Sequence, residues 1–267
     1  MLVASIGDLL LDVIVRLDAP IASDTDTYAR TQVAAGGQAA NLAAWVVELG
    51  DRARFLGKRA RDPAGRVVAE ALAGRGVEVV GPEVDRGTGT IVSLSHADGT
   101  RSMVSDRGVA PTFAPDELDP TWLDGCDWLH VPVYSLAREP LRSTALAAAR
   151  LVPRVSVDLS STAAIADLGV ETLRELLSEL APSLLLASEA EAALVGPVAA
   201  ETVVVHDASG CIVRDHGGEH AHAAVPADVV DATGAGDAFA AGFLLGGYEM
   251  ALRAGARCVA QMGAMPA

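Results

Sequence analysis

The sequence has few cysteines, few aromatic residues and no long uninterrupted apolar stretch. Its three cysteines, among 267 residues, are odd in number and widely spaced, without a Cys-x-x-Cys pattern. Neither a disulfide framework nor a zinc site is therefore signalled, and we expect buried thiols. No apolar run is long enough to cross a bilayer, and Gly7-Asp8 interrupts the first run where a secretory signal would continue. These absences predict a cytoplasmic protein with no membrane partner.

Positive charge is scarce as well. The chain has 20 Lys and Arg residues against 35 Asp and Glu residues, for a net charge of −15. A surface of that sign repels phosphates, so nucleic acid is not an expected partner. A bound nucleotide would need local compensation from helix N-termini, a divalent cation and a few basic side chains.

Apolar β-rich stretches alternate along the chain with Ala- and Leu-rich stretches. This pattern predicts an α/β fold over residues 1–267, with a mostly parallel sheet and helices on both faces. The expected strands are Leu2–Ile6, Arg54–Leu56, Asp127–Val131, Val155–Asp158, Ser183–Leu186 and Thr202–His206. The expected helices are Gln38–Leu49, Pro63–Arg75, Glu139–Leu151, Val170–Leu180, Glu189–Val195, Ala235–Leu245 and Met250–Met262. Two further segments, 13–33 and 88–104, show alternating apolar residues and turn signals, which indicate hairpin strands of a separate small sheet.

The most informative segment is Asp231-Ala-Thr-Gly-Ala-Gly-Asp237, which leads into an uncharged apolar helix. Gly234 and Gly236 have no Cβ, so a ligand can come close to the main chain there. The free N–H groups of Gly234, Ala235 and Gly236 in the first helical turn would attract a phosphate or an oxyanion. A carboxylate in the same turn suits a hydroxyl that must lose its proton beside a phosphoryl group. The segment therefore predicts a kinase whose base is Asp237, held ionised by the helix N-terminus.

A second glycine pair lies near the N-terminus, where Gly36 and Gly37 are followed by Gln-Ala-Ala and Asn41. The glycines permit close approach of the backbone to a ligand, and Asn41 offers one acceptor and two donors to the hydroxyls of a polyol. Asp12 stands in an apolar stretch and needs a partner there. Asp12 and, as the alternative, Asp8 are therefore the two candidates for a ligand-binding carboxylate in this part of the chain.

Both glycine segments resemble signatures of one family. Asp231–Gly242 resembles the C-terminal signature of the PfkB, or ribokinase-like, carbohydrate kinases, and Gly36–Ala43 resembles their N-terminal signature. The resemblance covers nearly the whole chain. It implies a ribokinase-like three-layer fold with a small β-sheet lid formed by 13–33 and 88–104, and a homodimer through that lid. It also implies ATP-dependent phosphorylation of a primary hydroxyl of a sugar or related polyol, with Asp12 as the family's sugar-binding Asp.

The segments that correspond to the family's nucleotide-binding motifs resemble them only in part. Ser188 and Glu191 stand where the family has Asn-x-x-Glu, the motif that organises magnesium and the triphosphate. The segment Val205–Gly210, which contains His206, stands where the family has Thr-x-Gly-x-x-Gly beneath the phosphates, and only its last residue, Gly210, is clearly retained.

The resemblance extends to cations. It implies ATP and Mg2+ as cofactors, with Glu191 and Asp231 at the metal site and Thr233 beside the nucleotide. The family's late loop helps to hold a monovalent cation near the backbone of Asp231 and Thr233, so K+ is a further expected cofactor.

Other acceptors and another class of protein stay open from the sequence. A phosphosugar would need a basic cluster, and Lys58, Arg59 and Arg61 form the only dense one. A nucleoside would need aromatic stacking partners, which are few. The altered Ser188 and His206 positions are also compatible with a non-catalytic sugar- or nucleotide-binding homologue. Asp237 argues against that reading, because a protein that only binds gains nothing from this carboxylate.

Overall fold

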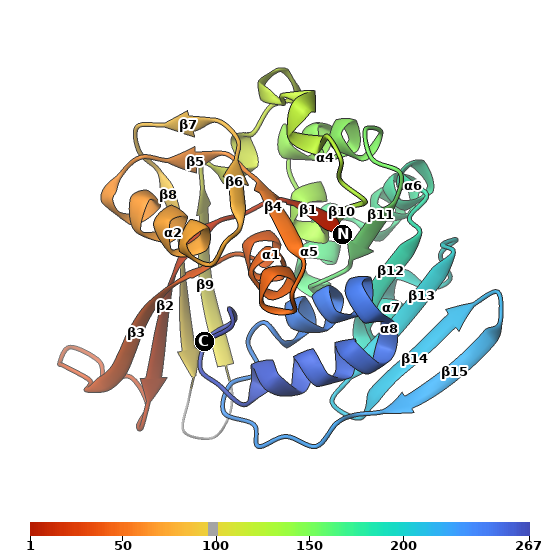
Figure 1. Ribbon diagram of the computed structural model, residues 1–267. Helices are drawn as coiled ribbons and strands as arrows, with labels where there is room; N and C mark the ends of the chain where they lie inside the picture. Colours follow the sequence, from red (N-terminus) through yellow and green to blue (C-terminus); the bar gives the residue numbers. More distant parts are fainter. Residues whose placement is uncertain (96–100) are drawn as a thin grey trace.

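A computed structural model describes residues 1–95 and 101–267, apart from the side chain of Arg101. Its main element is a nine-stranded sheet in the order β15-β14-β13-β12-β11-β10-β1-β4-β6 (Figure 1). From β6 to β13 neighbouring strands are parallel, whereas β14 and β15 are antiparallel additions. The strands are β1 (Leu2–Ile6), β4 (Arg52–Leu56), β6 (Glu78–Val80), β10 (Trp128–Pro132), β11 (Val155–Asp158), β12 (Leu184–Ser188), β13 (Thr202–Asp207), β14 (Gly210–Asp215) and β15 (Gly218–Ala223).

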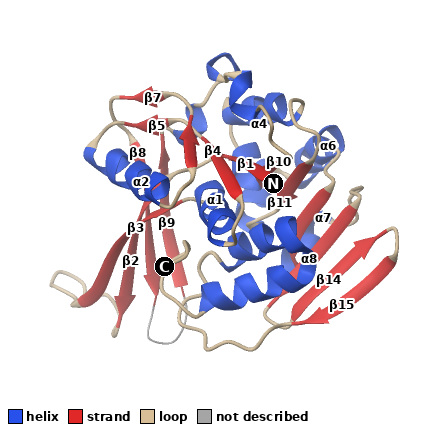
Figure 2. Cartoon of the chain, viewed as in Figure 1, coloured by secondary structure: helices blue, strands red, loops and turns tan. Residues whose placement is uncertain are grey.

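Helices cover both faces of this sheet (Figure 2). Successive side chains of a strand point to opposite faces, so Val3 of β1 packs with α1, α2 and α8 while its neighbours Leu2 and Ala4 pack with α3 to α7. The expected three-layer α/β arrangement is therefore present. The helices are α1 (Gln38–Glu48), α2 (Pro63–Gly74), α3 (Val133–Leu136), α4 (Leu141–Ala149), α5 (Thr162–Leu168), α6 (Val170–Leu180), α7 (Glu189–Val195) and α8 (Ala235–Val259), with 3-10 turns at Ala110–Thr112, Pro115–Glu117 and Pro120–Leu123.

A small four-stranded sheet projects from the side of the molecule (Figure 1). Its order is β3-β2-β8-β9, and its strands are β2 (Leu10–Leu17), β3 (Ala29–Gly36), β8 (Thr88–Ser95) and β9 (Arg101–Gly108). Both segments expected to form the lid contribute to it, although residues 96–100 of the second lie outside the described residues. A further pair, β5 (Arg59–Ala60) and β7 (Glu83–Val84), is parallel.

The chain departs from the expected elements near its C-terminal end. The β14–β15 hairpin is absent from the expected strands, because β15 has two histidines, a glutamate and no large apolar side chain and is mostly exposed. The two helices expected after Ala235 are both present: α8 consists of two helical stretches separated by non-helical backbone angles at Gly246 and Gly247. Among the described residues, no helix is both long and apolar enough to cross a membrane.

Candidate active site

The N-terminus of α8 is built on a left-handed glycine. Gly234 is the N-cap with φ 78°, and a Cβ added there would lie 2.5 Å from Cα of Ala264. The sequence therefore needs glycine at this position for two reasons, backbone angle and space. Ala235, Gly236 and Asp237 follow as the first helical residues. The N–H of Ala235 donates to the carbonyl of Ala232 at 3.4 Å, whereas those of Gly236 and Asp237 lack an intrahelical partner one turn earlier.

Asp237 lies in this first turn and is 7% exposed. Its Oδ2 accepts a hydrogen bond from Nδ2 of Asn41 at 2.8 Å, and Gln38 donates another to the same carboxylate. Both donors belong to the first turn of α1, which begins after the N-cap Gly37 with φ 100°. The two glycine segments singled out in the sequence thus meet, although Asn41 and Asp237 are 196 residues apart.

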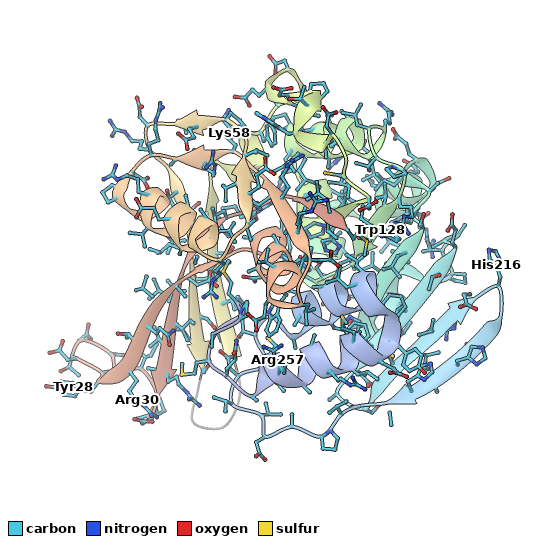
Figure 3. All side chains as sticks on the ribbon, in the orientation of Figure 1. Tyr28, Arg30, Lys58, Trp128, His216 and Arg257 are labelled. Atoms are coloured by element: carbon cyan, nitrogen blue, oxygen red, sulfur yellow. The ribbon has the colours of Figure 1, made fainter. Side chains whose placement is uncertain are left out.

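Packing of α1 along α8 holds these two turns together. Trp45 of α1 donates its indole N–H to the carbonyl of Ala264 at 2.8 Å. Arg257 of α8 forms an ion pair with Glu48 of α1, and Figure 3 shows it on the same side of the molecule as α1.

Asp12 is on β2 and faces the same space from the small sheet. Its carboxylate occupies the volume that a Cβ on Gly36 would need, which explains that glycine. Burial raises the pKa of Asp12 to about 6. Its Oδ1 is buried and has no hydrogen-bond partner among the described residues. Asp8, the alternative ligand, is instead bonded to Arg107, so Asp12 has the oxygen that a polyol hydroxyl could satisfy.

One cavity of about 340 Å³ brings most of the candidate residues together. The candidates in its wall are Asp12, Gly37, Asn41, Ser188, Glu191, His206, Thr233, Gly234, Ala235, Gly236 and Asp237. Gly36 packs behind Asp12, Gly210 lines a separate groove over β13 and β14, and Asp231 lies on the loop before α8.

Sequence reasoning missed several residues of this wall. Asp158, at the end of β11, is fully buried in the cavity wall and accepts a hydrogen bond from the N–H of Ser160 at 2.7 Å. Arg107 lines the cavity as well, and so does Tyr134, one of the few aromatic residues that the sequence placed near the site. The carboxyl ends of parallel strands are where α/β proteins place their ligands, so a strand-ending Asp in Val155–Asp158 was the available signal.

Burial and the nearby Glu191 carboxylate raise the pKa of Asp158 to about 7. Folding therefore favours its protonated form, and stability is lost as pH rises from the ordinary Asp pKa through the folded value. We expect Asp158→Asn to stabilise the protein by on the order of 2–4 kcal/mol above pH 7 and by almost nothing at pH 4. Melting temperatures of both proteins across this range measure the difference.

Asp167→Asn is the matched control, because this carboxylate is half exposed and paired with Arg138. The difference in melting temperature between this variant and the native protein should be small and should not change with pH. A gain from Asp158→Asn that does not grow between pH 4 and pH 7 would contradict the burial argument.

Ser188 and Glu191 form the start of α7. The Ser188 hydroxyl accepts from the N–H of Glu191 at 3.3 Å, and the Glu191 carboxylate accepts from the N–H of Ser188 at 2.8 Å. This reciprocal capping box explains why serine serves at the position where asparagine was expected. Glu191 is at the same time buried in the cavity wall, near Asp158.

His206 is the penultimate residue of β13 and stacks on Phe239 of α8 with ring centroids 4.6 Å apart. Its Nε2 is buried without a hydrogen-bond partner among the described residues. Burial lowers the pKa of His206 to about 4, so the ring is neutral at pH 7. A neutral imidazole beside the first turn of α8 can donate one hydrogen bond to an anion there.

Of the two residues expected at a metal site, Glu191 lines the cavity, whereas Asp231 lies on the loop before α8. Asp231 accepts hydrogen bonds from the N–H of Thr233 at 2.9 Å and from that of Gly263 at 3.1 Å. Within residues 1–95 and 101–267, no group of three His, Cys, Asp or Glu side chains is placed to bind a metal. Mg2+ often takes only one or two carboxylates together with phosphate oxygens, so Asp158 and Glu191 fit it.

The electrostatics of Asp237 differ from expectation. Burial raises the pKa of Asp237 well above its ordinary value, and the nearby Asp158 and Asp12 raise it further. The hydrogen bonds from Asn41 and Gln38 lower it only in part. The helix N-terminus therefore does not keep this carboxylate at its ordinary acidity, because desolvation outweighs the helix dipole. A raised pKa makes Asp237 a stronger proton acceptor once it is ionised.

The model of the pfkB family of carbohydrate kinases matches residues 1–261. The chain belongs to this family. Among curated relatives, an ATP-dependent ribose-1-phosphate kinase of Halopiger xanaduensis is 30% identical over 260 residues, covering 91% of this chain and 83% of the relative. A fructokinase of Escherichia coli is 28% identical over 277 residues, covering 87% of this chain and 88% of the relative.

Solved structures of pfkB-like proteins share the fold. An adenosine kinase from Sinorhizobium meliloti matches with a TM-score of 0.89 at 23% identity, over 99% of this chain and 95% of that one. A putative ribokinase II from E. coli, solved with ATP and Mg2+, matches with a TM-score of 0.86 at 20% identity, over 98% and 94%. The ribokinase-like fold and the assignment as an ATP-dependent carbohydrate kinase of the pfkB family are thus confirmed.

Proposed function

We propose that this kinase transfers the γ-phosphoryl group of ATP to a primary hydroxyl of a sugar or related polyol, with Asp237 as the general base. One observation carries this assignment. Asp237 stands in the first turn of α8, bonded to Asn41, in the same cavity as the unsatisfied Asp12 oxygen. The base, the polyol ligands and the anion-binding amides therefore share one space.

The chemistry follows from this placement. The Asp237 carboxylate accepts the proton of the attacking hydroxyl as its oxygen bonds to the γ-phosphorus and ADP leaves. In this proposal the N–H groups of Ala235, Gly236 and Asp237 stabilise the charge that accumulates on the phosphoryl oxygens, with that of Ala235 first leaving the carbonyl of Ala232. The small sheet beside the cavity limits the access of water, which would otherwise hydrolyse ATP.

Orientation of the polyol falls to Asp12 and Asn41, with Gly37 allowing close approach of the backbone. Oδ1 of Asp12 accepts a hydrogen bond from a substrate hydroxyl. That bond satisfies a buried acceptor that has no partner among the described residues. The spare Oδ1 of Asn41 is likewise buried without a partner in the described part of the chain.

We place the ATP phosphates beside the N-terminus of α8, because the remaining candidate residues lie around it. His206 Nε2 and the Thr233 region face the phosphates, and Ser188 supports Glu191. Mg2+ held near Asp158 and Glu191 would neutralise phosphate charge. We place K+ at the loop of Asp231, whose carboxylate already ties this loop to Gly263.

The small sheet is also the proposed homodimer surface. Large apolar side chains are exposed at its strands and the turn that joins β2 to β3, namely Ile21, Tyr28, Val33, Met103 and Val104. Tyr28 is 92% exposed and stands at the outer end of this sheet (Figure 3). Apolar side chains gathered at one end of a molecule are typical of a contact surface. A cytoplasmic location is proposed because the reaction consumes ATP.

The test is ADP release by the purified protein with ATP and Mg2+ over pentoses, hexoses, keto-deoxy sugar acids and nucleosides, with and without K+. We expect turnover with one class of free sugar. If no compound of the panel gives ADP release while calorimetry still detects binding of ATP and of a sugar, the result would favour a non-catalytic binding homologue instead.

A further inference from the structure

A bidentate ion pair stands in the polyol part of the cavity. Arg107 of β9 donates from Nε to Oδ2 of Asp8 at 2.6 Å and from Nη2 to Oδ1 at 2.8 Å. The two side chains are 17% and 9% exposed, and both line the cavity that holds Asp12 and Asp237. The guanidinium also lies 5.9 Å from the ring centroid of Tyr134. Two parallel charge-assisted bonds with little solvent make this a strongly fixed pair.

The rest of the cavity wall is acidic. It holds the carboxylates of Asp8, Asp12, Asp158, Glu191 and Asp237. Among the described side chains of the wall, the guanidinium of Arg107 is the only Lys or Arg group, and Asp8 already neutralises it. His206 adds no charge at neutral pH, because burial lowers its pKa to about 4. The polyol end therefore offers no uncompensated positive charge from any described side chain.

We propose that the acceptor is an uncharged sugar, and that the Asp8–Arg107 pair excludes phosphorylated and carboxylated sugars by occupying the one guanidinium of the site. This inference rests on the proposed function. An anionic group on the sugar would meet several carboxylates, and such like-charge contacts cost about 100-fold or more in affinity. To use Arg107 it would have to displace Asp8, which would leave a buried carboxylate without its partner.

Two relatives of this chain are named for different types of acceptor, one phosphorylated and one uncharged. The H. xanaduensis relative is named a ribose-1-phosphate kinase, whereas the E. coli relative is named a fructokinase. Both match most of this chain, so overall similarity does not separate the two acceptor types. The charge of the cavity wall does separate them, because a phosphosugar brings an anion to the acceptor end and a free sugar does not.

The experiment compares kcat/KM for ribose with ribose 1-phosphate and for fructose with fructose 6-phosphate in the native protein, by ADP release. We expect the preferred free sugar to exceed its phosphorylated form by about 100-fold or more. Asp8→Asn keeps the side-chain shape and frees Arg107. In this variant the ratio should fall at least about tenfold, with the phosphosugar gaining in absolute kcat/KM.

Asp85→Asn is the matched control, since it removes the same charge from an exposed pair with Arg61 outside the cavity. In this control the ratio of kcat/KM for the free sugar to kcat/KM for the phosphosugar should equal that of the native protein. If no sugar of either kind releases ADP, the proposed function itself fails. If the native protein uses the phosphosugar as well as the free sugar, or if folded Asp8→Asn keeps the native ratio, the charge exclusion is wrong while the kinase assignment stands. The native ratio decides even where Asp8→Asn does not fold.

Discussion

Asp237→Asn is expected to lower kcat for sugar phosphorylation by about 10³-fold, because it removes the group that accepts the substrate proton. The amide has nearly the same shape and still accepts the hydrogen bond from Asn41, so the cavity keeps its form. Measuring kcat and KM separately distinguishes the base from a binding group. Loss in kcat with little change in KM is the expected result, since the proton transfer occurs only in the transition state.

The same substitution should raise the melting temperature. The folded pKa of Asp237 is raised, so the ionised carboxylate costs stability as pH rises from its ordinary pKa through the folded value. Asparagine removes this cost at pH 8. Glu249→Gln, an exposed change on the same helix, should leave both kcat and melting temperature near native. Near-native turnover in Asp237→Asn would exclude Asp237 as the base.

Gly234→Ala is expected to cost about 2–4 kcal/mol of stability, from a left-handed backbone and a clash with the main chain. The added Cβ would lie 2.5 Å from Cα of Ala264, and φ at Gly234 is 78°. For a chain of this size the melting temperature should fall by roughly 5–10 °C. Since the strain falls at the first anion-binding amides, kcat should fall as well.

Gly236→Ala provides the matched comparison. A Cβ there would meet nothing nearer than Cε1 of His206 at 3.8 Å, which is an ordinary contact. Thermal unfolding of this variant should stay within about 2 °C of native, because the residue is already helical. Equal losses for the two variants would contradict the account of Gly234, since both add one methyl group to the same turn.

Gly234 and Gly236 also show what can and what cannot be predicted from the sequence. The sequence indicated that both free the backbone for a ligand, and both do line the cavity. Only the structure separates their reasons, because the neighbour that makes Gly234 obligatory is Ala264, thirty residues later. The central strands were predictable for a local reason. Apolar runs such as Leu2–Ile6 must be buried on both faces of a parallel sheet.

Features that depend on distant partners could not be predicted. The Asp8–Arg107 pair joins residues 99 apart, and neither stands in a motif that indicates the other. The raised pKa of Asp237 arises from burial first and then from the carboxylates of Asp158 and Asp12, which come from different strands. A helix N-terminus is visible in a sequence, whereas the desolvation that outweighs its dipole is a property of the folded cavity.

The meeting of α1 with α8 also has a consequence for the order of events during synthesis. Asn41 leaves the ribosome almost two hundred residues before Asp237, so the sheet strands from β1 to β13 can pair while the proton acceptor is still untranslated. Contacts between such distant segments form late, because the intervening chain must be ordered first. Under the proposed mechanism, a nascent chain therefore cannot phosphorylate a sugar until the segment that carries Asp237 has been synthesised and has docked on α1.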